Sequence, residues 1–332
     1  MHSTIKDDKS SSVAIFGLNG HQICRSPFIH HRMKIVAAGA CQREELPDDL
    51  PGREEIPIYN TLDELLKDDR IELVSLCSPR RADQAHHAIT CLENGKHVYA
   101  EKPCATTEED LDAIIETARR TGRKFHEMAG TAFEQPYLAM REIVLAGTIG
   151  DVVQILAQKS YPYKDTRPQD EGIDGGLICQ NGVHALRFIE QVGCRKISSI
   201  SAIETSYGNP KGGGLMMASA MNMRLQGGGI ATAIANYLNS NEFGTWGNEA
   251  LRIFGTQGFV EAVNGGRDTH LYLADRDLGP IDAGAPSYNW FGGVLDDIEG
   301  LGSLPVSLED ELHPTRMVIR AKASAAPRVN HH

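Results

Sequence analysis

A glycine-containing turn follows the first apolar run of the chain and offers a place for a dinucleotide. The run at 13–16 is apolar and partly β-branched, and the turn that follows reads Gly17, Leu18, Asn19 and Gly20. Backbone N–H groups of such a turn can hold a pyrophosphate. Against the pattern G-x-G-x-x-G only Gly17 matches, since Asn19 and Gln22 replace the other glycines. Cofactor binding and a turn without a ligand therefore both stay open here.

The end of the expected second strand bears on the choice between NAD and NADP. An acid at this place would hold the ribose hydroxyls of NAD. The chain has Ala40 there instead, and Arg43 follows three residues later. A small residue with a nearby cation leaves room for a 2′-phosphate, so Arg43 is a candidate cofactor-binding residue that favours NADP or no discrimination. The alternative is that Arg43 is a solvated loop charge.

Other catalytic motifs are missing from the sequence. His126 and Glu127 begin like a zincin helix, but Gly130 stands where the second histidine must be. The histidine pairs at 30–31 and 86–87 are adjacent, and adjacent side chains on a helix point in different directions. The chain has neither a G-x-S-x-G elbow nor a Walker loop. The sequence therefore predicts no metal site.

The elements that must position the turn alternate between strands and helices over the first 130 residues. Short apolar runs predict strands at 13–16, 35–38, 57–59, 71–76, 97–100 and 124–126. Helical patterns lie between them at 20–32, from 61 onward, at 82–94 and at 107–122. Strands separated by helices predict parallel pairing with right-handed crossovers. Residues 1–130 are therefore expected to form a doubly wound α/β domain that binds the dinucleotide.

The pattern changes in residues 131–332. After a helix at 136–146, runs that alternate apolar and polar residues lie between glycine-rich turns, and a helix at 313–325 closes the chain. These runs are 152–156, 200–205, 216–225, 229–238, 251–254 and 271–273. They predict an α+β domain for substrate binding and oligomerisation, with an open, mostly antiparallel sheet that helices cover on one face. Because a large free face is a common oligomer surface, we expect a homo-oligomer, either a dimer or a tetramer.

A combination of motifs in the stretch 71–103 resembles a known family. Ser78-Pro79 and the run 95–98 are followed by Glu101-Lys102-Pro103. The chain resembles the Gfo/Idh/MocA oxidoreductases here, and the likeness extends through 111–122, 137–150, 175–184, 250–261 and 313–325. The resemblance implies an N-terminal Rossmann domain, a C-terminal domain with an open sheet, and NAD or NADP as cofactor. The implied reaction is hydride exchange with a hydroxyl of a sugar, an inositol or a related carbohydrate.

The same resemblance implies the site residues. Members of the family carry the lysine of Glu-Lys-Pro and a later D-x-G-x-H motif. Lys102 and His184 match, while Gln180 stands in the aspartate position. Oxidation of a carbinol needs a base for the hydroxyl proton and groups that favour the developing alkoxide. The expected catalytic residues are therefore Lys102, His184 and Gln180.

Further contacts are expected around these three residues. The expected cofactor contacts are Gly17, Leu18, Asn19, Gly20, Arg43, Ser78, Pro79, Glu101 and Lys102. The expected substrate contacts are Lys102, Lys164, Arg167, Gln180, Asn181 and His184, with Asp174, Cys179, Asn236 and Tyr237 as weaker candidates.

Two rival functions stay open at this point. One is a family member that retains NAD and cleaves glycosidic bonds through transient oxidation. The other is a non-catalytic ligand-binding or regulatory relative, which Gln180, Gln22 and Ala40 would favour.

The composition of the chain argues against some classes of binding partner. The 33 lysines and arginines against 44 aspartates and glutamates leave a net charge of −11, which repels a phosphate backbone and argues against nucleic acid. No apolar run reaches the roughly 18 residues that span a bilayer. The first 12 residues lack the apolar core of a signal peptide, and the seven cysteines form no C-x-x-C pair. We therefore expect a cytoplasmic protein that acts on a small molecule, with no membrane partner.

Overall fold

The chain forms two compact units in the computed structural model, which describes residues 10–25 and 28–325. The first unit comprises Met1–Met128 with Asn289–Leu312, and the second comprises Ala129–Tyr288 with His313–His332. The chain thus passes from one unit to the other two residues before the expected boundary. The segment 289–312 packs with the first unit, although it was expected in the second domain, 131–332.

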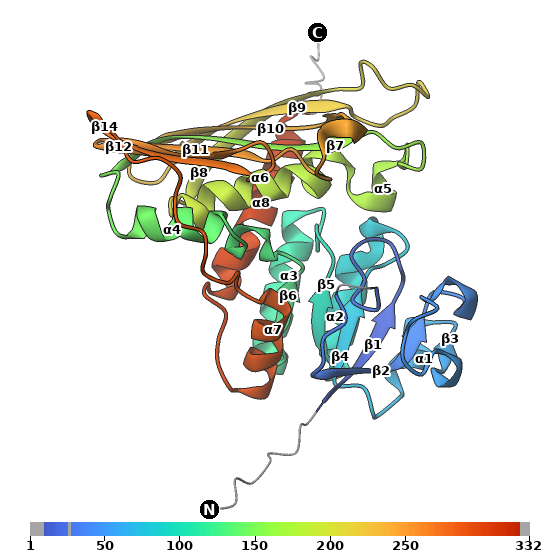
Figure 1. The fold of residues 1–332 in the computed structure, drawn as a ribbon. Helices are drawn as coiled ribbons and strands as arrows, with labels where there is room; N and C mark the ends of the chain where they lie inside the picture. The colour runs from blue at the N-terminus through green and yellow to red at the C-terminus, as the bar shows by residue number, and fades with distance from the viewer. Residues whose placement is uncertain (1–9, 26–27, 326–332) are drawn as a thin grey trace, which may run out of the picture. The chain divides into compact units, whose positions relative to one another are not determined.

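The first unit is built around a parallel sheet with the strand order β3-β2-β1-β4-β5-β6 (Figure 1). This order confirms the expected doubly wound fold, because the chain leaves β1 in one direction and returns beside it at β4. Ligands of such sheets bind where the order reverses, outside the carboxyl ends of the strands. The strands are β1 (Ser11–Phe16), β2 (Met33–Gly39), β3 (Ile58–Tyr59), β4 (Leu73–Leu76), β5 (His97–Ala100) and β6 (Phe125–Glu127).

Threonine side chains at the start and a glycine at the end determine the limits of helices in the first unit. Helix α3 (Glu108–Thr121) begins after Thr107, whose side chain accepts a hydrogen bond from the Asp110 N–H, and it ends at Gly122 with φ 67°. Thr61 caps α1 (Leu62–Leu66) in the same way, as the sequence predicts. The other helices of this unit are α2 (Gln84–Glu93) and α7 (Trp290–Glu299).

The helix expected at 20–32 does not form in the described part of this stretch, 20–25 and 28–32. Gln22 explains the difference. Its side chain is fully buried, and its amide donates to the carbonyls of Gly17 and Ser75. Its Oε1 accepts from the N–H of Ile23, which a helical carbonyl would otherwise hold. The Gln22 side chain thus occupies the space next to β1 and β4 in which a helix would normally pack against the strands.

The second unit holds an eight-stranded sheet with the order β14-β13-β12-β11-β7-β10-β9-β8. Only the β7–β10 pair is parallel, so the prediction of a mostly antiparallel sheet is confirmed. The strands are β7 (Val152–Pro162), β8 (Ile197–Thr205), β9 (Ala218–Leu225), β10 (Ile230–Asn239), β11 (Ala250–Gly255), β12 (Gly258–Val263), β13 (Asp268–Leu273) and β14 (Arg276–Asp277). The helices are α4 (Tyr137–Leu145), α5 (Glu171–Asp174) and α6 (Val183–Arg187), and α8 (Leu308–Ala325) runs into this unit from the first.

The two faces of this sheet differ in chemistry. Helices α4 and α6 lie on one face (Figure 1), where alanines and methionines such as Ala233 and Met221 are fully buried. The opposite face carries exposed apolar side chains on β7, β8 and β10: Leu156, Ile203, Ile230, Ile234 and Leu238. This alternation, which has the period of two that a strand requires, leaves an apolar surface uncovered within the described residues.

Candidate active site

The glycine turn after β1 packs tightly against the loop after β4. Gly17 has φ 73°, and a Cβ there would lie 2.1 Å from the Cys77 carbonyl oxygen. The N–H of Asn19 donates to the same carbonyl, and its side chain donates to the Pro79 carbonyl at 3.2 Å. Both loops lie at the carboxyl ends of their strands, beside the point where the strand order reverses. The expected residues of the turn and of Ser78-Pro79 are therefore brought together.

The segment with Lys102 follows β5, the next strand of the same sheet. The Lys102 side chain is 1% exposed, and its Nζ lies 3.9 Å from Glu101 Oε1. Gln84, at the start of α2, donates through its amide to the carbonyls of both Glu101 and Pro103. Its Oε1 accepts from the N–H of Ser78 at 3.3 Å. Gln84 therefore fixes the backbone on both sides of Lys102 and ties it to the loop after β4.

Glu101 connects this segment to the glycine turn. Its Oε2 accepts from the backbone N–H of His21 and lies 2.9 Å from His21 Nδ1. Burial alone would raise the pKa of the Glu101 carboxyl, but His21, Lys102 and Arg81 hold it well below its usual range. Gly20 is required here, because a Cβ would lie 2.6 Å from the Glu101 carboxyl group. The carboxylate thus stays charged beneath the turn.

Arg43 does not join these residues through its side chain. Its guanidinium donates to the carbonyls of Arg53 and Ile56, and so holds the loop between β2 and β3 in place. Arg43 is therefore not a solvated loop charge, since the side chain is part-buried and both terminal nitrogens donate to backbone carbonyls.

These residues fit a dinucleotide with one departure from the usual arrangement. The positive φ of Gly17 and Gly20 allows the sharp turn after the first strand that a dinucleotide site uses, and the absence of their Cβ atoms lets this turn pack against the Cys77 carbonyl and the Glu101 carboxylate. The usual helix N-terminus behind the turn is missing within residues 20–25 and 28–32. The hydrogen bond from Arg81 Nη2 to the Asn19 carbonyl, 2.7 Å long, places a buried cation against the turn instead.

In the second unit, Gln180 and His184 lie on one continuous helical segment. A single α-helical turn, α6, is preceded by a π-helical stretch at Ile178–Gly182 and followed by another at Phe188–Val192. Such stretches are rare and occur often at functional sites. His184 is 6% exposed, and Gln180 is partly exposed.

A chain of aromatic rings connects Gln180 with the two expected cations. The Tyr237 hydroxyl donates to Gln180 Oε1 at 3.3 Å, and the Arg167 guanidinium lies 3.7 Å from the centre of the Tyr237 ring. Arg167 also lies 5.9 Å from the Tyr161 ring, which packs at 5.5 Å against Trp246. Lys164 completes the series, with its Nζ 4.3 Å above the Trp246 ring. Lys164, Arg167 and Gln180 therefore share one aromatic-lined region.

The remaining candidates of this unit have structural partners. Asn181 is fully buried, and its side-chain amide donates to the Asn236 carbonyl, which ties the helical segment to β10. The Cys179 thiol points to the Val318 carbonyl on α8, and burial raises its pKa to about 12. The expectation that Cys179 lines a cleft is therefore wrong. Asp174 accepts from the N–H of Gly176 at 3.0 Å and is nearly buried.

Sequence reasoning missed four residues of these two networks. Gln84 and Arg81 look like surface polar residues at a helix start, and only their full burial shows otherwise. Tyr161 was missed because the strand was expected to end at 156, although β7 continues to Pro162. Trp246 lies outside any regular element. A tryptophan in a polar loop was the one signal that could have found it.

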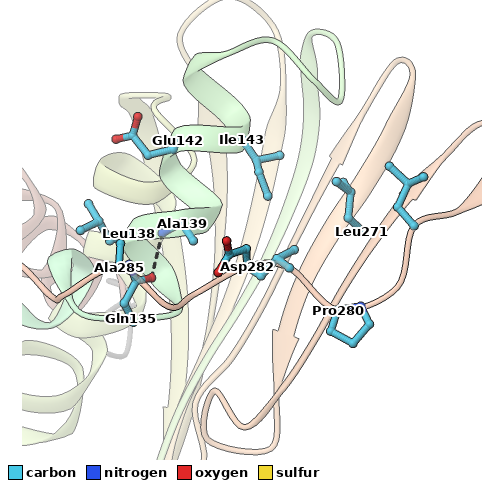
Figure 2. Close-up of a pocket in the computed structure, with 11 residues that line it drawn as sticks. Gln135, Leu138, Ala139, Glu142, Ile143, Leu271, Pro280, Asp282 and Ala285 are labelled. Atoms are coloured by element: carbon cyan, nitrogen blue, oxygen red, sulfur yellow. Dashed lines mark hydrogen bonds between the residues drawn. The ribbon is translucent and has the colours of Figure 1, made fainter.

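A cavity of about 580 Å³ lies elsewhere in the second unit, between α4 and the segment 278–285 (Figure 2). Its walls are mostly apolar, with Leu138 and Ile143 on one side and Leu271 on the other, and Glu142 and Asp282 supply the acids. None of the candidate site residues lines this cavity.

Over 10–25 and 28–325, no three or more histidines, cysteines, aspartates or glutamates are grouped so that they could hold a metal ion. No helix in that part of the chain combines the length and apolar character needed to cross a membrane.

Comparison with known families gives matches over both units. The family model described as an oxidoreductase family with an NAD-binding Rossmann fold matches residues 12–128. The model of the GFO/IDH/MocA C-terminal domain matches residues 137–261.

Individual relatives are more distant. The oxidoreductase ORF334 of Rhizobium meliloti, itself uncharacterized, is 30% identical over 155 residues, which are 45% of this chain and 46% of that protein. A trans-1,2-dihydrobenzene-1,2-diol dehydrogenase of Xenopus tropicalis is 26% identical over 240 residues, 71% of this chain and 68% of that protein. The chain spans about half the length of the first curated relatives that it matches. The structure of an oxidoreductase from Thermotoga maritima shares the fold with a TM-score of 0.81 at 24% identity, over 95% of this chain and 97% of that one.

Proposed function

Since the chain belongs to the Gfo/Idh/MocA oxidoreductase family, with its NAD-binding Rossmann fold, we propose that it is an NAD- or NADP-dependent dehydrogenase. The proposed substrate is a small polyol, namely a sugar, an inositol or a related carbohydrate. Its reacting group is a secondary hydroxyl. The named dehydrogenase of Xenopus tropicalis acts on a ring with two adjacent hydroxyls, which supports a ring diol as the reacting unit.

The observation that carries the proposal is the position of Lys102. Removing an ammonium group from water costs free energy. A lysine that is 1% exposed therefore indicates a functional role for this side chain. Lys102 lies on the carboxyl side of β5, in the same hydrogen-bonded network as the glycine turn. Hydride transfer is the chemistry that a bound nicotinamide would supply. Lys102 would move the hydroxyl proton, and Gln84 would hold the lysine backbone in register for that step.

The second unit would bind the rest of the substrate. We propose that His184 and Gln180 contact the reacting hydroxyl and its neighbour, with Asn181 behind them. Arg167 and Lys164 would donate to further hydroxyls, and the ring of Trp246, which is 52% exposed and packs against Tyr161, suits the C–H face of a six-membered ring. A cytoplasmic location is proposed with this function.

The direct test is an oxidation assay with a panel of ring polyols and both cofactors. Inositols, aldoses and a cyclic trans-diol would each be added with NAD⁺ or NADP⁺, and formation of the reduced nicotinamide would be followed by absorbance. We expect turnover with at least one ring polyol. Tight retention of NAD without net reduction would favour the glycosidase-type alternative, and failure to bind either cofactor would favour a non-catalytic relative.

Gln180 gives a specific prediction about charge beside His184. Gln180→Asp restores the family's carboxylate, which can stabilise a protonated histidine as a neutral amide cannot. We expect the variant to fold and to oxidise polyols faster than the wild type. Gln180→Asn is the matched control, since it shortens the side chain equally without adding charge, and it should not raise the rate. Loss of an existing activity in Gln180→Asp alone would show that the glutamine is a specific adaptation, contrary to this account.

The exposed face of the second sheet supports a homo-oligomer, a dimer or a tetramer, as part of the proposal. Ile203 is 73% exposed, and Ile234 lies in the same row of the sheet, with Ala220 of β9 between them. Introducing charges with Ile203→Glu and Ile234→Glu should dissociate the assembly in sedimentation experiments at micromolar concentration. The control Leu301→Glu changes an exposed apolar residue of the first unit and should leave the mass of the assembly unchanged. A monomeric wild type would refute the proposal.

A further inference from the structure

We propose that the loop after β2 makes the protein select NAD(H) over NADP(H), and that Glu45 is the residue chiefly responsible. This inference rests on the proposed function, because it concerns the cofactor of the same site. In doubly wound folds the adenosine ribose lies at the end of the second strand, where an acid favours NAD and a free cation favours NADP. In this chain β2 ends at Gly39, and Ala40 follows with φ 51°.

The only cation that directly follows β2 is not available to a phosphate. Both terminal nitrogens of Arg43 donate to backbone carbonyls, one to Arg53 and one to Ile56 at 2.9 Å. Turning the guanidinium toward a 2′-phosphate would remove its hydrogen bonds to both part-buried carbonyls, and the Arg53 carbonyl would keep the 3.4 Å bond from the Ile56 N–H. Such a loss offsets much of what the new ion pair would gain.

Arg53 is engaged in the same loop. Its Nε and Nη2 each donate to the Arg43 carbonyl at 3.2 Å, and its Nη1 pairs with Asp48. The two arginines therefore close the segment 43–56 on itself. Their guanidinium groups therefore stabilise the loop through these hydrogen bonds and the ion pair with Asp48, and do not extend toward a ligand.

An acid is held close to the end of β2. Glu45 Oε2 accepts from the backbone N–H of Gln42 at 2.8 Å, so the carboxylate is held against the first residues after β2. Burial raises the pKa of the Cys41 thiol, and the charge of Glu45 raises it further. Glu44 adds exposed negative charge to the same loop.

The 2′-hydroxyl and the 2′-phosphate respond oppositely to this environment. A hydroxyl can donate to a carboxylate, as in proteins that prefer NAD. A phosphate carries close to two negative charges, and at the separations within such a loop its repulsion by one carboxylate amounts to about tenfold in affinity. Room beside the small Ala40 supplies no attraction that would compensate for this repulsion.

The test is a titration of the wild-type protein with NADH and with NADPH, followed by nicotinamide fluorescence. We expect NADH to bind about tenfold or more tightly at low salt, and the ratio to shrink as added salt screens the repulsion. Equal or tighter binding of NADPH would overturn this inference and leave the proposed function standing. Binding of neither cofactor would contradict both.

The variant Glu45→Gln tests whether Glu45 causes the preference for NADH over NADPH. Glutamine keeps an oxygen that can accept from the Gln42 N–H, so the loop should fold, while the charge is removed. We expect the preference for NADH to fall by about three- to tenfold. Glu116→Gln is the matched control, because it removes one exposed carboxylate from α3 and should leave the ratio unchanged. An unchanged ratio in Glu45→Gln would refute the role of Glu45.

Discussion

Replacing Lys102 with alanine should lower kcat by about 10²- to 10⁴-fold, the usual effect of removing a general acid or base. The affinity for NAD(H) should stay close to that of the wild type, because the glycine turn, and not this side chain, is expected to hold the pyrophosphate. Steady-state kinetics on an identified substrate and a cofactor titration would measure the two quantities separately.

Two further variants make this result interpretable. Lys102→Met retains most of the side-chain volume in a fully packed position, so a loss of activity there cannot be assigned to a cavity. Lys67→Ala removes an exposed lysine of the same unit and should leave kcat unchanged. Turnover at the wild-type rate by Lys102→Ala would show that the assignment of this residue is wrong.

The second large effect is expected on stability, at a buried ion cluster of the first unit. His126 on β6 lies 2.9 Å from Glu311 through Nδ1 and 3.1 Å from Asp297 through Nε2, and the second oxygen of Glu311 accepts from the Glu127 N–H. Burial would lower the pKa of His126, but Glu311 and Asp297 raise it to about 9. The cluster therefore connects the last strand of the sheet to the returning segment 289–312.

Glu311→Gln should lower the free energy of unfolding by about 3–5 kcal/mol, since it leaves a buried charge without its main partner. The corresponding decrease in Tm is roughly 5–15 °C. Glu309→Gln is the control on the same helix. Its carboxylate is half exposed and pairs with an exposed Arg119, so the change should cost about 0–1 kcal/mol. Equal Tm values for the two variants would contradict the role assigned to the cluster.

The same cluster predicts a pH dependence with a definite sign. The pKa of His126 is raised on folding, so its contribution to stability is complete below pH 6.5 and is lost as the pH rises through about 9. The difference in Tm between the wild type and Glu311→Gln should therefore narrow between pH 7 and pH 9.5. A difference that is constant over this range would contradict a charged His126.

The strands of the first unit could be predicted because each is a short apolar run bounded by glycine, proline or a polar residue. His97–Ala100 is such a run, directly before Glu101-Lys102-Pro103, and the structure has it as β5 with the same limits. The prediction of a helix at 20–32 was wrong because of a contact that the local sequence pattern does not contain. The buried amide of Gln22 binds Ser75, 53 residues away, and no periodicity in the sequence reveals such a partner.

In the candidate site, too, some residues could be predicted from local sequence and others depend on distant contacts. Lys102 could be found from its motif, but the commitment of Arg43 to two carbonyls of its own loop depends on tertiary geometry. Gln84 was missed because a polar residue at a helix start usually faces solvent, whereas this one is fully buried between two loops. The return of 289–312 to the first unit also has no compositional signal. It depends on contacts such as the hydrogen bond from Trp290 to the Glu127 carbonyl.

Transfer of a carbinol hydrogen to the nicotinamide tests the central claim most directly. The protein would be incubated with oxidised cofactor and with inositol, glucose or a cyclic trans-diol carrying deuterium on the ring carbinol carbons. Mass spectrometry of the recovered cofactor is the measurement. We predict that one deuterium appears on the nicotinamide ring with at least one of these substrates, and that Lys102→Ala lowers the rate of labelling by about 10²-fold or more. Cofactor that binds to the wild type but gains no deuterium from any of them would contradict the account.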